Sequence, residues 1–104
     1  MVYYDKVRVE TELKLVEALK ITWGALRLRS EEARCEVFKE LSDSVLGLVC
    51  AVGGYCYEYK SVLDATDLLE LHDDFKEHYK DNMPYLAIGV VDDMINETRR
   101  IIEC

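Results

Sequence analysis

The sequence predicts an all-α protein, a bundle of about four helices in a single domain that covers residues 1–104. Three observations lead to this prediction. The chain contains one proline, its apolar residues recur mostly every three or four positions, and no linker, internal repeat or low-complexity segment interrupts it. Half of the residues are hydrophobic, so a chain of this length can build a core without disulfides.

The first predicted helix runs from about Glu10 to Arg29, and residues 1–9 are either extended or the first turns of this helix. Its broad apolar face comprises Val9, Leu13, Leu15, Val16, Leu19, Trp23 and Leu26. Glu12 projects onto the same face at 100° per residue. A carboxylate there needs a partner. It is either an edge residue that reaches water or a basic group such as Lys20, or a metal ligand that faces inward.

The second predicted helix extends from Ser30 to Gly54. Ser30 is a suitable cap, and Glu31 and Glu32 suit the positive end of the helix dipole. Gly53-Gly54 is a typical helix stop. The apolar face consists of Val37, Phe38, Leu41, Val45, Leu48, Val49 and Val52. Residues 45–52 are apolar around nearly the whole circumference, which is typical of an enclosed helix. We expect a second subunit to supply part of that enclosure, with Gly47 permitting close approach.

The second helix also carries a line of carboxylates, Glu32, Glu36, Glu40 and Asp43, spaced by four, four and three residues. Like charges at these spacings repel each other. Water, a basic partner or a bound cation would compensate for that repulsion.

Three alternating tyrosines, Tyr55, Tyr57 and Tyr59, come next. They form either a short extended link or the start of the third helix. Base stacking and packing at a subunit edge are their two interpretations, and the second is the simpler one.

The third predicted helix runs from about Ser61 or Asp64 to Lys80. Its inner face comprises Ala65, Leu68, Leu69, His72, Phe75 and Tyr79, and its outer face Asp67, Glu70, Asp73, Asp74, Glu77 and Asp81. The acidic face is expected to be solvated, and His72 is expected to be a core histidine. Asp74 and His78 have i, i+4 spacing, which also suits a transition metal.

The clearest break is Asp81-Asn82-Met83-Pro84, because proline is favoured in a first helical turn. The fourth predicted helix runs from about Pro84 to Glu103. Its apolar stripe comprises Ala87, Ile88, Val91, Met94, Ile95, Thr98, Ile101 and Ile102.

Composition excludes several functions. The net charge of −8 argues against binding to nucleic acid or to anionic membranes and fits the binding of cations. The four cysteines form no Cys-x-x-Cys pair and are expected to be free thiols in a reducing compartment. No signal peptide is visible, and the longest apolar run, residues 45–52, is too short to span a bilayer. We therefore expect a cytoplasmic protein.

Carboxylates on helices are the chemistry that remains, because no nucleophile motif or glycine-rich phosphate loop occurs. Glu40 and Asp43, at i, i+3, form half of a magnesium site, Glu36 extends it by a turn, and Glu12 or Glu17 on the first helix is placed to face it. Magnesium there would orient a triphosphate and activate a water.

The segment from Lys39 to Leu46, KELSDSVL, followed by an apolar helix that reaches glycines, resembles the Glu-x-x-Asp helix of the MazG-like nucleotide pyrophosphohydrolases. This resemblance implies an all-α homodimer or larger oligomer that uses magnesium to convert a nucleoside triphosphate to a monophosphate and pyrophosphate. It also implies that Lys80 and Asn82 meet the phosphates. The family's Glu-x-x-Glu on the preceding helix is missing, because Glu10, Glu12 and Glu17 are spaced by two and five.

The leading hypothesis is thus a magnesium-dependent nucleotide pyrophosphohydrolase. Its metal ligands would be Glu12, Glu36, Glu40 and Asp43, of which Glu40 and Asp43 are catalytic, and its phosphate contacts Lys80 and Asn82. The alternative is a non-catalytic helical homo-oligomer that acts as an acidic protein-interaction module.

Overall fold

The fold is all-α, as the sequence predicts. The computed structural model describes residues 5–26 and 29–103, and these ranges contain helices and no strand. The elements are α1 (Lys6–Ala25), α2 (Glu31–Tyr59), a single 3-10 turn η1 (Val62–Ala65), α3 (Thr66–Lys80) and α4 (Pro84–Glu103).

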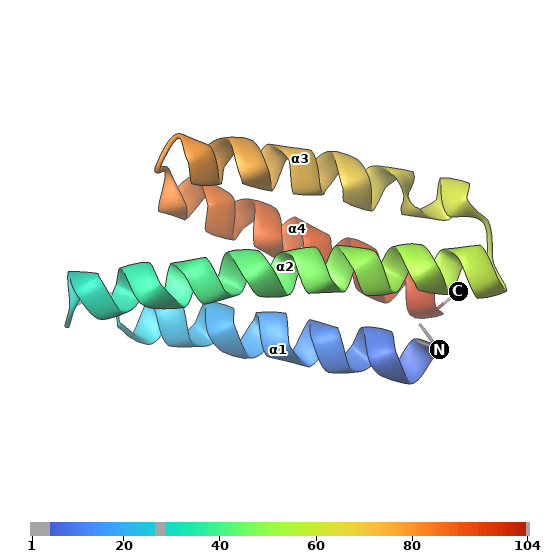
Figure 1. Cartoon of the computed structure of the whole chain (residues 1–104), viewed down its shortest axis with the longest axis horizontal. Helices are drawn as coiled ribbons and strands as arrows, with labels where there is room; N and C mark the ends of the chain where they lie inside the picture. Colours follow the sequence, from blue (N-terminus) through green and yellow to red (C-terminus); the bar gives the residue numbers. More distant parts are fainter. Residues whose placement is uncertain (1–4, 27–28, 104) are drawn as a thin grey trace.

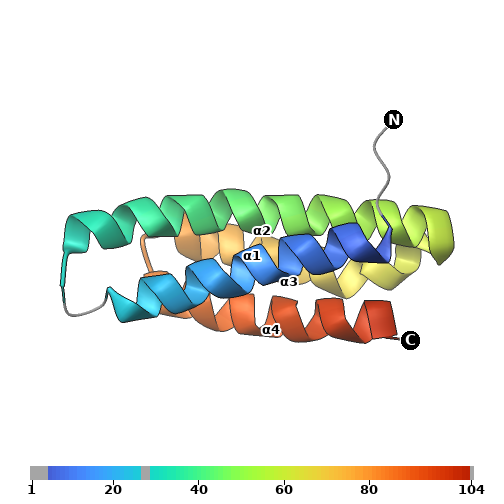
Figure 2. The same cartoon turned by 90° about the horizontal axis from the view of Figure 1, so that it is seen from below.

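The helices form two antiparallel hairpins that pack into an elongated bundle. Figure 1 shows α1 beside α2, and α3 beside α4, with η1 leading from the end of α2 into α3. Figure 2, turned by 90°, shows that α1 and α4 also lie next to each other, so the two hairpins close around one core. The bundle measures 42 × 23 × 23 Å.

The core consists of the stripes that helical spacing predicts. The completely buried side chains include Leu41, Val45, Leu48 and Val52 of α2, Leu68 and Phe75 of α3, Val91 and Met94 of α4, and Val9 and Val16 of α1. His72 lies among them at 7% exposure, so its prediction as a core residue is confirmed. The six carboxylates predicted for the outer face of α3 and its end are all exposed.

The predicted end of the second helix at Gly53-Gly54 is wrong, because α2 continues to Tyr59. Neither glycine adopts a positive φ. Helical glycine costs about 1 kcal/mol, but the flanking Val52 and Cys56 are completely buried, and their burial offsets that cost. The three tyrosines therefore belong to α2. Lys60 is the C-cap of α2, and Ser61 and Asp64 form a capping box that starts η1.

Residues 6–9, which the sequence leaves open between an extended segment and the first turns of the helix, belong to α1. The Asp5 carboxylate accepts a hydrogen bond from the Arg8 backbone N–H (2.9 Å) and starts α1 at Lys6. Leu15, predicted for the apolar face, is 47% exposed. The apolar stripe of α1 is wider than the surface that its neighbours α2 and α4 cover, so its edge remains in solvent. Likewise Leu69, predicted for the inner face of the third helix, is 49% exposed.

No helix in the described part of the chain is long and apolar enough to cross a bilayer. Cys35 and Cys50 are exposed free thiols, and Cys56 is a buried one. Cys104 lies outside the described residues.

Candidate functional site

Glu12 lies at the edge of the interface between α1 and α2. Its side chain is 18% exposed and pairs with Arg8, Nε to Oε1 at 3.3 Å, one turn earlier. Its carboxylate reaches Gly47 of α2, where an added Cβ would lie 3.0 Å from Glu12 Oε2. Lys20, a partner considered for Glu12, instead pairs with Asp92 of α4. The glycine therefore provides the room in which this carboxylate sits.

The three predicted carboxylate ligands of α2 are all exposed. Glu36 pairs with Lys39 at 3.6 Å, between two side chains that are themselves largely exposed. Asp43 precedes Gly47 by four residues, which places it on the same side of α2 and about 6 Å away along the axis. The structure thus puts Glu12 one helical turn from Asp43 along a shared edge.

The surface of α1 opposite Glu40 and Asp43 is apolar. The two helices are antiparallel (Figure 1), and Glu12 is level with Gly47. Equal rise along both helices therefore puts Val16 level with Asp43, and Leu19 level with Glu40. Val16 is completely buried and Leu19 packs partly against the core. The carboxylate of α1 nearest these levels, Glu17, pairs with Arg99 of α4 at 2.9 Å, so α1 directs no carboxylate toward Glu40 and Asp43, which is the structural counterpart of the missing Glu-x-x-Glu.

One chain does not assemble the predicted metal centre from its described residues. Nowhere in residues 5–26 and 29–103 do three or more His, Cys, Asp or Glu side chains gather so that they could hold a metal ion. This holds for the α2 carboxylates and for Asp74 with His78. A centre completed by carboxylates of a second chain stays a prediction.

Lys80 and Asn82, the predicted phosphate contacts, lie at the turn between α3 and α4. Lys80 is exposed. Asn82 adopts φ 55°, a conformation that asparagine tolerates better than most residues, and the turn is closed by a hydrogen bond from Met83 N–H to His78 C=O (2.9 Å). Asn82 lines a cavity of about 290 Å³ with Cys35 and Phe38 of α2. Asp43 is eight residues beyond Cys35, about 12 Å along the helix.

That cavity contains a group that sequence reasoning missed, the guanidinium of Arg34. Its Cζ lies 3.8 Å from the centre of the Trp23 ring and 5.2 Å from that of Tyr85. One terminal nitrogen donates to the Tyr85 hydroxyl at 3.0 Å. Arg34 Nε is buried and has no hydrogen-bond acceptor. The remaining lining comes from Glu31 and Pro84.

The sequence contains one weak signal for this arrangement. Arg34 precedes Phe38 by four residues, so it continues the apolar face of α2 by one turn. Its aromatic partners lie on α1 and α4, and a periodicity within one helix cannot identify them.

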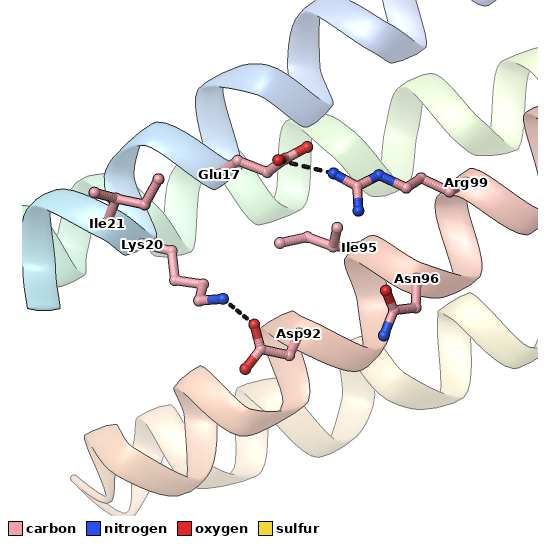
Figure 3. A pocket seen from close by; sticks show the side chains of 7 residues that line it. All are labelled: Glu17, Lys20, Ile21, Asp92, Ile95, Asn96 and Arg99. Atoms are coloured by element: carbon pink, nitrogen blue, oxygen red, sulfur yellow. Dashed lines mark hydrogen bonds and ion pairs between the residues drawn. The ribbon is translucent and has the colours of Figure 1, made fainter.

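A second cavity, of about 240 Å³, lies between α1 and α4 (Figure 3). Glu17 pairs with Arg99 at 2.9 Å, and Lys20 pairs with Asp92 across the same gap. The four charges cancel, and both pairs join the two helices. Each partly exposed pair contributes about 0–1 kcal/mol, so this cavity is a point of attachment between the hairpins.

Two titratable groups are shifted by burial. Burial raises the pKa of the Cys56 thiol, and the nearby Asp64 carboxylate raises it further. This thiol is therefore less reactive than an exposed one. Burial also lowers the pKa of His72, with a smaller effect in the same direction from Lys76 and an opposing one from Asp73.

Searches against protein-family models, curated proteins and solved structures found no match to this chain.

Proposed function

We propose that the chain acts as a non-catalytic helical module in the cytoplasm. It pairs with a second copy of itself through α2 and presents its acidic α3 face to a basic protein partner. An exposed apolar stripe on the second half of α2 is the observation that carries this proposal.

The stripe consists of Leu46, Cys50, Gly53 and Tyr57, spaced by four, three and four residues. Leu46 is 52% exposed, Tyr57 is 74% exposed, and the Cys50 side chain is exposed as well. The opposite side of α2 in this region is already buried in the core. Exposed apolar residues that continue along one helix face favour an interaction surface more than the same residues scattered singly.

The distribution of charge along α2 favours a second copy in the antiparallel direction. The stripe is continued toward the start of α2 by Glu36, Lys39 and Asp43. Two α2 helices that cross antiparallel near Cys50 would pair their apolar halves and keep the two sets of carboxylates at opposite ends. A parallel pair would place these carboxylates side by side. The small side chains at positions 50 and 53 allow a close approach.

The acidic face of α3 supports the second half of the proposal. Its exposed carboxylates are Asp67, Glu70, Asp73, Asp74, Glu77 and Asp81. Lys76, which pairs with Asp73 at 3.2 Å, and Lys80 compensate for only part of this charge. A basic protein surface would be attracted at long range by such a face.

The oligomeric state tests this proposal. We expect a dimer in sedimentation equilibrium, and a monomer after Leu46→Arg. Leu69→Arg is the matched control because Leu69 is similarly exposed, at 49%, but lies on α3; that variant should remain dimeric. Mild oxidation should cross-link the dimer through Cys50, so Cys50→Ser should abolish the cross-link and Cys35→Ser should preserve it. A wild-type chain that stays monomeric at the highest soluble concentration would refute the proposal.

The magnesium-dependent nucleotide pyrophosphohydrolase is a second candidate. It is favoured by the position of Glu12, whose carboxylate lies along the same edge of α2 as Asp43 and Glu40. Since α1 offers only apolar residues level with those two carboxylates, this candidate requires further ligands from a second chain. Glu36 would extend the site, and Lys80 and Asn82 of the second chain would contact the phosphates of the substrate.

Incubation with a panel of nucleoside triphosphates and Mg²⁺ tests this candidate through the release of pyrophosphate. Glu40→Gln should abolish the release, and Leu46→Arg should abolish it as well if the site lies between chains. Pyrophosphate release no greater than that of Glu40→Gln would reject the enzyme.

A further inference from the structure

The cavity between the ends of α1, α2 and α4 brings a cation and an apolar lining together. It measures about 290 Å³ and is lined by Trp23, Glu31, Arg34, Cys35, Phe38, Asn82 and Pro84. This volume is near the lower end of the range for small-molecule sites, roughly 300–1,000 Å³.

The cation is held in place but is not neutralised. No carboxylate of the described residues forms an ion pair with Arg34, although the chain has an excess of acidic residues. The guanidinium is fixed by its stacking on Trp23 and by its hydrogen bond to the Tyr85 hydroxyl. That bond uses one of its five N–H donors. The buried Nε–H has no acceptor in the described part of the protein.

A planar guanidinium with unused donors binds a carboxylate through two parallel hydrogen bonds. A lysine here would be a hydrated point charge, whereas arginine stacked on an aromatic ring keeps its fork in one orientation. Asn82 lines the same cavity, and its side-chain amide is a neutral donor available to a ligand there. Phe38, Pro84 and the edge of Trp23 supply an apolar surface for the rest of a ligand.

We propose that this cavity binds a small organic carboxylate with a flat apolar body, whose carboxylate meets the Arg34 guanidinium and whose body packs against Trp23, Phe38 and Pro84. The size of the cavity fits a ligand of about one aromatic ring. Glu31 lies at the same cavity and repels the bound anion, so it limits the affinity. The site is at the opposite end of α2 from the stripe of Leu46, Cys50, Gly53 and Tyr57, and it is independent of self-association.

The chain contains a single tryptophan, so its intrinsic fluorescence reports directly on this cavity. Phenylacetate is the probe. Phenylacetamide, which has the same body without the charge, and acetate, which has the charge without the body, are the controls. We expect saturable change in Trp23 fluorescence with phenylacetate, and binding at least roughly tenfold weaker with either control.

Variants of the charged residues test whether the carboxylate of the ligand binds Arg34. Arg34→Gln should weaken phenylacetate binding by roughly tenfold or more, whereas the matched Arg99→Gln, about 22 Å further along α4 than Pro84, should leave it unchanged. Glu31→Gln should tighten binding, and this variant removes no core contact. The melting temperature and circular dichroism of each variant establish that it is folded.

Equal responses to phenylacetate and phenylacetamide, or equal affinities of wild type and folded Arg34→Gln, would overturn the proposal. Absence of any saturable response would overturn it as well, and Arg34 would then be a packing residue of Trp23 and Tyr85. Weaker binding by Glu31→Gln would show that the site selects a cationic group, which also contradicts an anion site.

Discussion

Replacing Gly47 by alanine tests how closely Glu12 is packed against α2. Alanine in place of a helical glycine stabilises a helix by up to about 1 kcal/mol when nothing opposes the new methyl group. For 104 residues, an unfolding entropy of roughly 2.1 cal/mol/K per residue makes 1 kcal/mol equivalent to about 5 °C in melting temperature. Gly89→Ala in α4 is the matched control because a Cβ there has no heavy atom within 4 Å, so it should gain the full amount.

At Gly47 the new Cβ would lie 3.0 Å from Glu12 Oε2, closer than an ordinary van der Waals contact. Glu12 would have to withdraw and loosen its ion pair with Arg8, which contributes about 0–1 kcal/mol at this exposure. We therefore expect Gly47→Ala to gain at most about half of the Gly89→Ala gain. In a Glu12→Ala background the obstacle is removed, so Gly47→Ala should regain the remainder.

Thermal unfolding of the four chains in this double-mutant cycle, at one protein concentration, measures the coupling between positions 12 and 47. We expect a coupling of about 0.5–1 kcal/mol. If Gly47→Ala stabilises wild type as much as Gly89→Ala does, the carboxylate is not confined against α2. The shared edge with Asp43, on which the pyrophosphohydrolase candidate depends, would then lose its support.

Three further predictions concern separate parts of the chain. Burial lowers the pKa of His72, so the unfolded chain binds a proton more readily than the folded one. The contribution of His72 to stability should therefore be fully present above about pH 6.5 and be lost as the pH falls toward the folded pKa. His72→Gln should flatten this pH dependence of the melting temperature. Ser30→Ala should cost about 1 kcal/mol, or about 5 °C, because the Ser30 hydroxyl accepts a hydrogen bond from Ala33 N–H (3.2 Å) and caps α2; an unchanged melting temperature would contradict that capping role. Leu15→Glu with Leu19→Glu should create carboxylates opposite Glu40 and let Mg²⁺ raise the melting temperature by about 6 °C at a tenfold excess over the dissociation constant; a response no larger than that of the matching Gln pair would show that the two helix levels do not meet.

Helical periodicity identified the helices and most of the core because each apolar stripe has one set of neighbours that it can face. In α4 the apolar spacing predicts that Val91 and Met94 are buried, and both are completely buried. The helix also starts at Pro84, where the sequence predicts its start. The end of α2 was mispredicted for the opposite reason. Whether Gly53-Gly54 stops a helix depends on what buries Val52 and Cys56 around it, and this is a tertiary property.

For the candidate sites too, the sequence can group residues of one helix but cannot bring together residues of different helices. The sequence places Glu36, Glu40 and Asp43 near one another on α2, because they share a helix. It cannot indicate that α1 presents Val16 and Leu19 at their level, since the relative height of two helices depends on packing along their whole length. The Arg34 cavity was missed because its residues come from α1, α2 and α4, and from the turn before α4.

The apolar surface of α2 is larger than the surface that the other helices of one chain bury. Helical periodicity puts Leu46 and Leu48 on opposite sides of α2, and a single chain buries only the second, at 0% exposure against 52%. The three other helices all lie against the side of α2 that is already buried, so within residues 5–26 and 29–103 nothing covers the stripe from Leu46 to Tyr57. A second copy covers it with the same apolar residues and, when antiparallel, separates the carboxylates of the two α2 helices. Any catalytic role for Glu40 and Asp43 would need ligands from outside the chain, since α1 provides them with none, and an antiparallel pair of α2 helices keeps the carboxylates of the partner's α2 away from them.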